Sequence, residues 1–158
     1  MSRMRATLLA VMAAAPAVLA TLGVLAFAGR EMSGTTPFSD GPPRNVAEAA
    51  GTGQVAAVLR FLRAGEDPTR FWPVRPDLIS STVTRPTGLE AAVWTGSGLM
   101  ELLDRRGYIR DEGTRQHLTC LAKDIGKQEV VVYLSPGRTP SCEPGAALET
   151  VRDRSRPR

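Results

Sequence analysis

Apolar residues along this chain recur in short clusters that glycine interrupts. Beyond residue 44, an alanine-containing apolar segment leads to Gly53, and a second apolar segment leads to Gly65. The same order of apolar segment, glycine and apolar segment returns around Gly96 and around Gly126. Because glycine adopts positive φ readily at helix ends, the pattern predicts pairs of short helices joined by glycine turns.

The three predicted helix pairs are each too small to be stable alone. One pair cannot bury its own apolar face, so copies of it must stack against one another. Val46, Leu89 and Leu118 stand at matching places in the three copies and are expected to lie along a shared interior. The sequence therefore predicts an all-α fold built from repeated helical hairpins.

The repeated unit resembles the ankyrin repeat, whose form is T-P-L-H-x-A-A-x-x-G followed by V-x-x-L-L-x-x-G-A-D. The first copy matches the second half of that form at several positions: Ala49, Ala50, Gly53, Val58, Phe61, Leu62, Gly65 and Asp67. No copy has the complete T-P-L-H element, and the second copy has Gly88 and Glu90 in place of its proline and histidine. The resemblance implies a solenoid of about three helix–turn–helix repeats over residues 44–136. An unrelated small helical bundle is the alternative.

An inserted loop is predicted between the first two copies. The spacing from Gly53 to Gly96 exceeds the usual period of about 33 residues by roughly ten. The prolines of residues 68–86 exclude a long helix there. Insertions between repeats of this family form loops, which often lie on the binding face.

The inserted loop is rich in the residues that most often anchor protein interfaces, namely aromatic residues and arginine. The candidate partner-binding residues in the loop and in the following helix are Arg70, Phe71, Trp72, Arg75 and Trp94. The alternative is that Phe71 and Trp72 fold back and cover an apolar edge of the helix stack. A protein partner is expected, and no small-molecule substrate.

Residues 6–29 contain no charged side chain and are long enough to cross a bilayer as a helix. They predict either an uncleaved membrane anchor or a signal peptide cleaved after Ala28 within residues 1–30. In both cases the N-terminal arginines keep that end in the cytoplasm. The remainder of the chain, after a linker over residues 31–43, is then expected outside the inner membrane, anchored to it or released into the periplasm.

The net charge of +4 does not indicate nucleic-acid binding. The excess arginine lies at the two ends of the chain, so the predicted domain lacks the basic surface that a nucleic-acid partner requires. Residues 137–158 are expected to be a largely disordered tail, with a short capping helix over residues 146–152.

The titratable and sulfur-bearing residues give little support to catalysis. His117 is the only histidine, and Cys120 lies on the same predicted helix face. A cysteine-dependent enzyme is one hypothesis, but no phosphate loop or nucleophile elbow is present, and no cofactor is expected. One histidine and two cysteines are too few for a usual zinc site. Outside the cytoplasm, Cys120 and Cys142 are expected to form a disulfide, with two free thiols as the alternative.

The sequence thus favours a protein-binding module in the bacterial cell envelope. The expected mode is docking of a partner on the concave face and the inserted loop. An immunity-type inhibitor of a toxin enzyme is the alternative, because such a protein would also act by binding.

Overall fold

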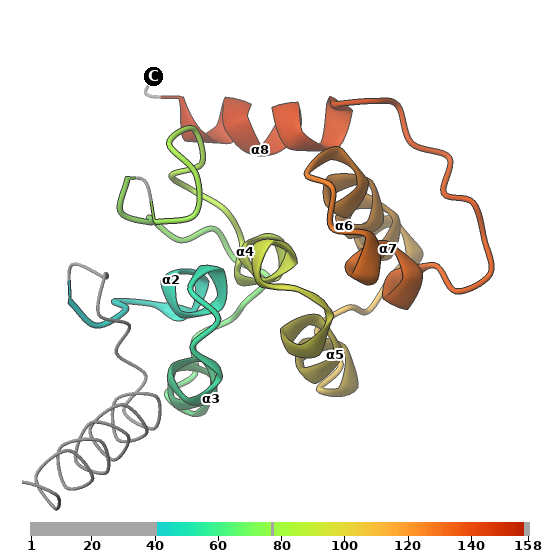
Figure 1. Ribbon diagram of the computed structural model, residues 1–158. Coiled ribbons are helices and arrows are strands. Elements are labelled where there is room, and N and C mark those ends of the chain that lie inside the picture. Colours follow the sequence, from blue (N-terminus) through green and yellow to red (C-terminus); the bar gives the residue numbers. More distant parts are fainter. Residues whose placement is uncertain (1–40, 77, 157–158) are drawn as a thin grey trace, which may run out of the picture. The chain divides into compact units, whose positions relative to one another are not determined.

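The computed structural model describes residues 41–76 and 78–156, and this part of the chain is all-helical (Figure 1). The all-α prediction is confirmed over this range. Within it, no residues form a β-strand, and only two isolated bridges occur, one inside the inserted loop and one between Phe71 of the loop and Thr87. The helices belong to a compact unit that begins at Pro42. They are α2 (Val46–Gly51), α3 (Val55–Arg63), α4 (Gly88–Thr95), α5 (Ser97–Arg105), α6 (Glu112–Asp124), α7 (Gln128–Leu134) and α8 (Ala146–Ser155).

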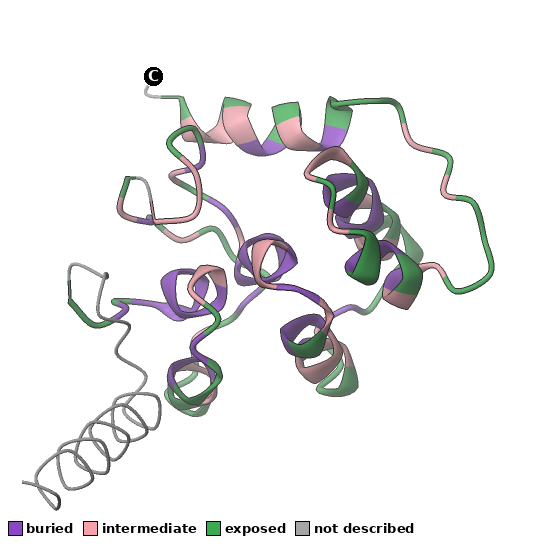
Figure 2. Ribbon diagram, in the orientation of Figure 1, coloured by how far each residue is buried: buried purple, intermediate pink, exposed green. Residues whose placement is uncertain are grey.

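The first six of these helices form three consecutive hairpins. Helix α2 packs against α4 and α4 packs against α6, while α5 packs against α7. Helices α2 and α4 are buried along most of their length (Figure 2). Ala49, Ala50, Ala91 and Ala92 have no exposed surface, and their small side chains allow the two helices to approach closely.

Glycine forms the turn within each hairpin. Gly53 and Gly126 have φ of 69° and 76°, a left-handed conformation that other residues rarely adopt. In both turns, the next N–H donates to the carbonyl five residues before it, at 2.9 and 2.8 Å, as in a Schellman motif. Gly96, with φ of 108°, separates α4 from α5 by itself. The first and third turns therefore share one geometry, and the second is tighter.

Large apolar side chains from all three hairpins meet in one core. Val46, Leu89 and Leu118, which the sequence places at matching positions, are all buried in α2, α4 and α6. Met100 and Leu103 of α5 have no exposed surface. Burying a side chain of this size contributes about 1.5–3 kcal/mol, which makes the shared core the main stabilising feature of the hairpins.

The inserted loop, residues 68–86, folds back against the helices. Val74 and Val83 are buried, and Ile79 lies directly over α2. A Cβ atom at Gly51 would lie 2.3 Å from Ile79 Cγ1, so only glycine leaves room for this contact. The loop therefore packs against the helices as part of the core and does not project into solvent.

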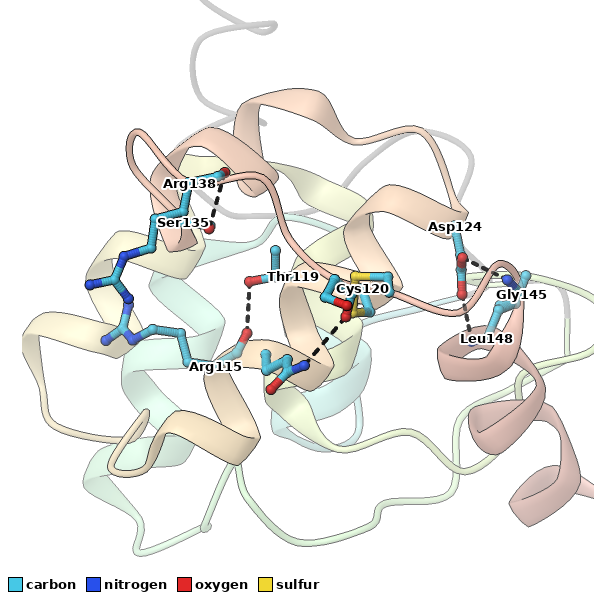
Figure 3. The surroundings of a disulfide bond; sticks show 11 residues. Arg115, Thr119, Cys120, Asp124, Ser135, Arg138, Gly145 and Leu148 are labelled. Atoms are coloured by element: carbon cyan, nitrogen blue, oxygen red, sulfur yellow. Dashed lines mark hydrogen bonds between the residues drawn. A yellow bond between two sulfur atoms is a disulfide. The ribbon is translucent and has the colours of Figure 1, made fainter.

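The short helix expected over residues 146–152 is present and extends to Ser155, so the C-terminal segment has more structure than the largely disordered tail that the sequence predicts. Helix α8 covers Ala146–Ser155 and packs against α6, with Ala147 and Val151 buried. Asp124 of α6 accepts hydrogen bonds from the N–H groups of Gly145 and Leu148, which satisfies the first turn of α8 (Figure 3). This cap comes from a distant residue, so the local sequence of the tail gave no sign of it.

Within the described residues, no helix combines the length and the hydrophobicity needed to span a bilayer. The predicted anchor or signal peptide at residues 6–29 lies outside the described part of the chain, as does most of the predicted linker.

Candidate functional site

A groove of about 700 Å³ lies between the start of the inserted loop, the connection from α5 to α6, and helices α6 and α8. We call it the Phe71 groove. The residues of its lining that bear on function are Asp67, Phe71, Glu90, Tyr108, Arg110, Asp111, His117 and Arg154. Its lining combines aromatic, acidic and basic side chains.

Glu90 is the buried charge of the groove, since only 3% of the residue is exposed. It closes a capping box at the start of α4. Thr87 Oγ1 accepts from Glu90 N at 3.0 Å, and Glu90 Oε2 accepts from Thr87 N at 2.8 Å. This local motif fixes the carboxylate at the helix N-terminus, where the helix dipole favours negative charge.

The second oxygen of Glu90 binds side chains from α6 and α8. His117 Nε2 lies 2.8 Å from Glu90 Oε1, and Arg154 Nη2 donates to the same oxygen. An ionised carboxylate only accepts hydrogen bonds, so His117 Nε2 carries the hydrogen. Burial raises the pKa of Glu90, but the hydrogen bonds from His117, Arg154 and Thr87 outweigh it and hold the pKa below 4.5. The groove therefore holds a fixed negative charge at neutral pH.

The lowered pKa of Glu90 predicts a loss of stability in acid. A carboxyl with a depressed pKa in the folded state stabilises the fold above its unfolded value of 4.5. That contribution is lost as the pH falls through the pKa of Glu90 in the folded state. We expect Glu90→Gln to lower the free energy of unfolding by about 2 kcal/mol at neutral pH. The difference from the wild type should shrink below pH 4.5 in urea titrations, and a difference independent of pH would contradict the assignment.

Phe71 lines the groove and is 52% exposed, so its ring is accessible to a partner. The guanidinium carbon of Arg154 lies 4.4 Å from the centre of its ring, a cation–π contact. Arg154 therefore touches both the aromatic ring and the buried carboxylate of the groove.

The other partner-binding candidates lie elsewhere. Arg70 is exposed, Trp72 is half-buried and donates from Nε1 to the carbonyl of Asp67 at 2.9 Å, and Trp94 is half-buried against the core. Of the five residues that the sequence singled out, the structure brings only Phe71 to the groove lining.

Arg75 of the inserted loop forms an ion pair with the buried carboxylate of Glu48. Its Nε and Nη2 donate to the two carboxylate oxygens of Glu48 at 3.1 and 3.0 Å, and its backbone N–H donates to Glu48 at 3.0 Å. The side chain of Glu48 is 1% exposed and that of Arg75 is 16% exposed. Burial raises the pKa of Glu48, but the hydrogen bonds from Arg75 and Arg44 bring it below its usual value. Arg75 thus joins the inserted loop to α2.

Cys120 and Cys142 form a disulfide that ties α6 to the segment before α8 (Figure 3). While this bond is intact, Cys120 has no thiol to act as a nucleophile. His117 is directed to Glu90, as described above. Among the described residues, no group of histidine, cysteine and acidic side chains is arranged to hold a metal ion.

Glu90 and Arg154 are two of the groove residues that the sequence did not single out. In the sequence, Glu90 appeared only as a departure from the ankyrin pattern, although Thr87-x-x-Glu90 is also the signature of a capping box. Arg154 belongs to the predicted disordered tail, and no local pattern links it to a residue so distant in the sequence. The capping box could have indicated Glu90, whereas nothing indicated its pairing with Arg154.

Comparison of the chain with protein-family models, curated proteins and solved structures finds no match. The described residues form an all-α domain that carries a groove built around a buried carboxylate and an exposed aromatic ring. Its function is therefore inferred from the geometry of that groove.

Proposed function

We propose that this chain is a short ankyrin-like solenoid that binds another protein. Three consecutive helical hairpins, with glycine at each turn and alanine between the inner helices, support the solenoid. Val46, Leu89 and Leu118 are buried in the three inner helices, as stacking of repeats requires. The length of α6 and the tighter turn at Gly96 mark where the chain departs from a regular repeat.

The Phe71 groove is the proposed docking site, and the exposure of Phe71 above the buried charge of Glu90 is the observation that carries this proposal. Aromatic and arginine side chains dominate the energetics of protein interfaces, especially where a charge is shielded from water. The groove volume of about 700 Å³ suits a few side chains of a partner.

We place this interaction outside the cytoplasm, in the cell envelope. The Cys120–Cys142 disulfide supports that compartment because the cytoplasm keeps thiols reduced. The uncharged segment at residues 6–29 supports either attachment to the inner membrane or release after cleavage.

Site-specific crosslinking tests the docking site. We expect a photoreactive phenylalanine analogue at position 71 to crosslink in cells to one partner protein. The matched control is the same analogue at Val132 of α7, which is 59% exposed and lies outside the groove lining. Denaturing gels followed by mass spectrometry of the crosslinked band provide the measurement.

A crosslink from position 71 that is absent from position 132 supports the proposal. Equal crosslinking from both positions, or none from position 71, contradicts it. The identity of the crosslinked protein also separates a general binding module from an inhibitor, because an inhibitor would be joined to an enzyme whose activity falls on binding.

A further inference from the structure

Arg154 of α8 occupies the Phe71 groove in the way that a ligand side chain would. Its guanidinium contacts the ring of Phe71 on one side, at 4.4 Å, and donates to the buried carboxylate of Glu90. Its side chain is 27% exposed, so the charge is largely withdrawn from water. An aromatic face and an ionised carboxylate together form a receptor for a guanidinium group.

The charge of the groove changes when Arg154 is disregarded. The remaining carboxylates of the lining are Asp67, Glu90 and Asp111, and the only other arginine there is Arg110. The groove without Arg154 is therefore acidic, and a positively charged ligand complements it. The two rim carboxylates, Asp67 and Asp111, are exposed and within reach of solvent-borne ligands.

The attachment of α8 to the inserted loop consists of a few polar contacts at its C-terminal end. Ser155 Oγ accepts from the N–H groups of Thr84 and Arg85 at 3.0 and 3.2 Å, and Arg152 Nε donates to Thr82 at 3.2 Å. The apolar contribution of α8 comes from Ala147 and Val151, which are buried, and from Leu148, which is partly buried against the core. Such contacts break at a modest cost in free energy.

The disulfide lies before α8 in the sequence and is independent of these contacts. It holds Cys142 against α6, so the segment leading to α8 stays attached when the helix leaves the groove. This attachment gives Arg154 a high effective concentration near the groove, so Arg154 rebinds Glu90 and Phe71 whenever no competitor is present. Helix α8 is thus positioned to leave the groove and return to it while the segment before it stays attached to α6.

We propose that the Phe71 groove recognises an arginine-bearing segment of a partner protein, and that Arg154 occupies the arginine position until the partner displaces it. This rests on the proposed function and names the chemistry of the partner. Binding of the partner requires release of α8, so the observed affinity is lowered by the fraction of molecules in which Arg154 occupies the site.

Removal of Arg154 tests this competition. The probe is a labelled seven-residue glycine–serine peptide with one central arginine and blocked ends, and its binding to the full chain in mild detergent is followed by fluorescence anisotropy. We expect Arg154→Ala to bind the arginine peptide at least tenfold more tightly than the wild type does. Peptides with central leucine or glutamate should bind at least tenfold more weakly to the same variant.

Two further variants control this result. Arg156→Ala removes an arginine from the same end of the chain, but Arg156 is 71% exposed and pairs only with Asp153, so peptide affinity should not change. Ser155→Ala loosens α8 without touching the groove and should also tighten peptide binding, by a smaller factor. If Arg154→Ala proves too unstable to measure, Ser155→Ala still tests the competition.

The proposal is overturned if neither Arg154→Ala nor Ser155→Ala tightens binding, or if the leucine and glutamate peptides bind equally well. Concentration-dependent dimers of Ser155→Ala, which keeps Arg154, in light scattering would assign the groove to α8 of a second copy instead. Crosslinking from position 71 decides the proposed function separately. A crosslinked partner together with unchanged peptide affinity would refute only the arginine recognition.

Discussion

Replacing Arg75 with alanine is expected to lower the free energy of unfolding by about 3 kcal/mol. The substitution leaves the carboxylate of Glu48 buried with no guanidinium partner, since that side chain is only 1% exposed. An uncompensated buried charge is among the most destabilising single changes in a protein core. Urea unfolding monitored by circular dichroism at neutral pH gives the measurement.

A substitution at Glu48 separates the contribution of the ion pair to stability from the contribution of Arg75 packing. In a Glu48→Met background no buried carboxylate remains beside Arg75, so Arg75→Ala should cost only about 1 kcal/mol there. Arg70→Ala, at an exposed arginine of the same loop, should change stability by less than about 0.5 kcal/mol. An equal cost of Arg75→Ala in both backgrounds would show that the pair with Glu48 is not the cause.

Replacing both Cys120 and Cys142 with alanine is expected to lower the free energy of unfolding by about 3 kcal/mol. The disulfide joins residues with a sequence separation of 22 and restricts the unfolded chain accordingly. In a small domain, a contribution of this size is a large part of the total stability. The measurement is the urea midpoint of the double variant against that of the wild type.

Reducing agent provides the control for the disulfide. It should lower the urea midpoint of the wild type to that of the double variant and leave the double variant unchanged. A wild-type midpoint that does not respond to complete reduction would contradict a stabilising disulfide. The result also reports on α8, because the disulfide holds the segment from which α8 begins.

The helical hairpins were predictable because their signals are local. Gly53, Gly96 and Gly126 mark turns at which the backbone takes positive φ, and the apolar segments beside them identify the buried faces. These preferences act between residues that are close in the sequence. The pairing of Cys120 with Cys142 was also predictable, because the chain has no other cysteine.

The site was predictable only in part, and Phe71 and Arg75 illustrate why. Both are interface-type residues in the same proline-rich loop, and their composition alone does not distinguish them. The structure leaves Phe71 half-exposed at the groove and brings Arg75 to Glu48. The difference depends on how the loop folds over α2, where Ile79 fills the space above Gly51.

The sequence by itself determined that this protein is built from short helices joined at glycine turns, because helix propensity, apolar periodicity and turn conformation are properties of neighbouring residues. Only the tertiary structure decided that α8 packs against α6, that Glu90 receives Arg154, and that Arg75 pairs with the buried Glu48. These features depend on contacts between residues far apart in the sequence, such as the cap of α8 by Asp124. Such contacts exist only once the chain has folded and brought those residues together.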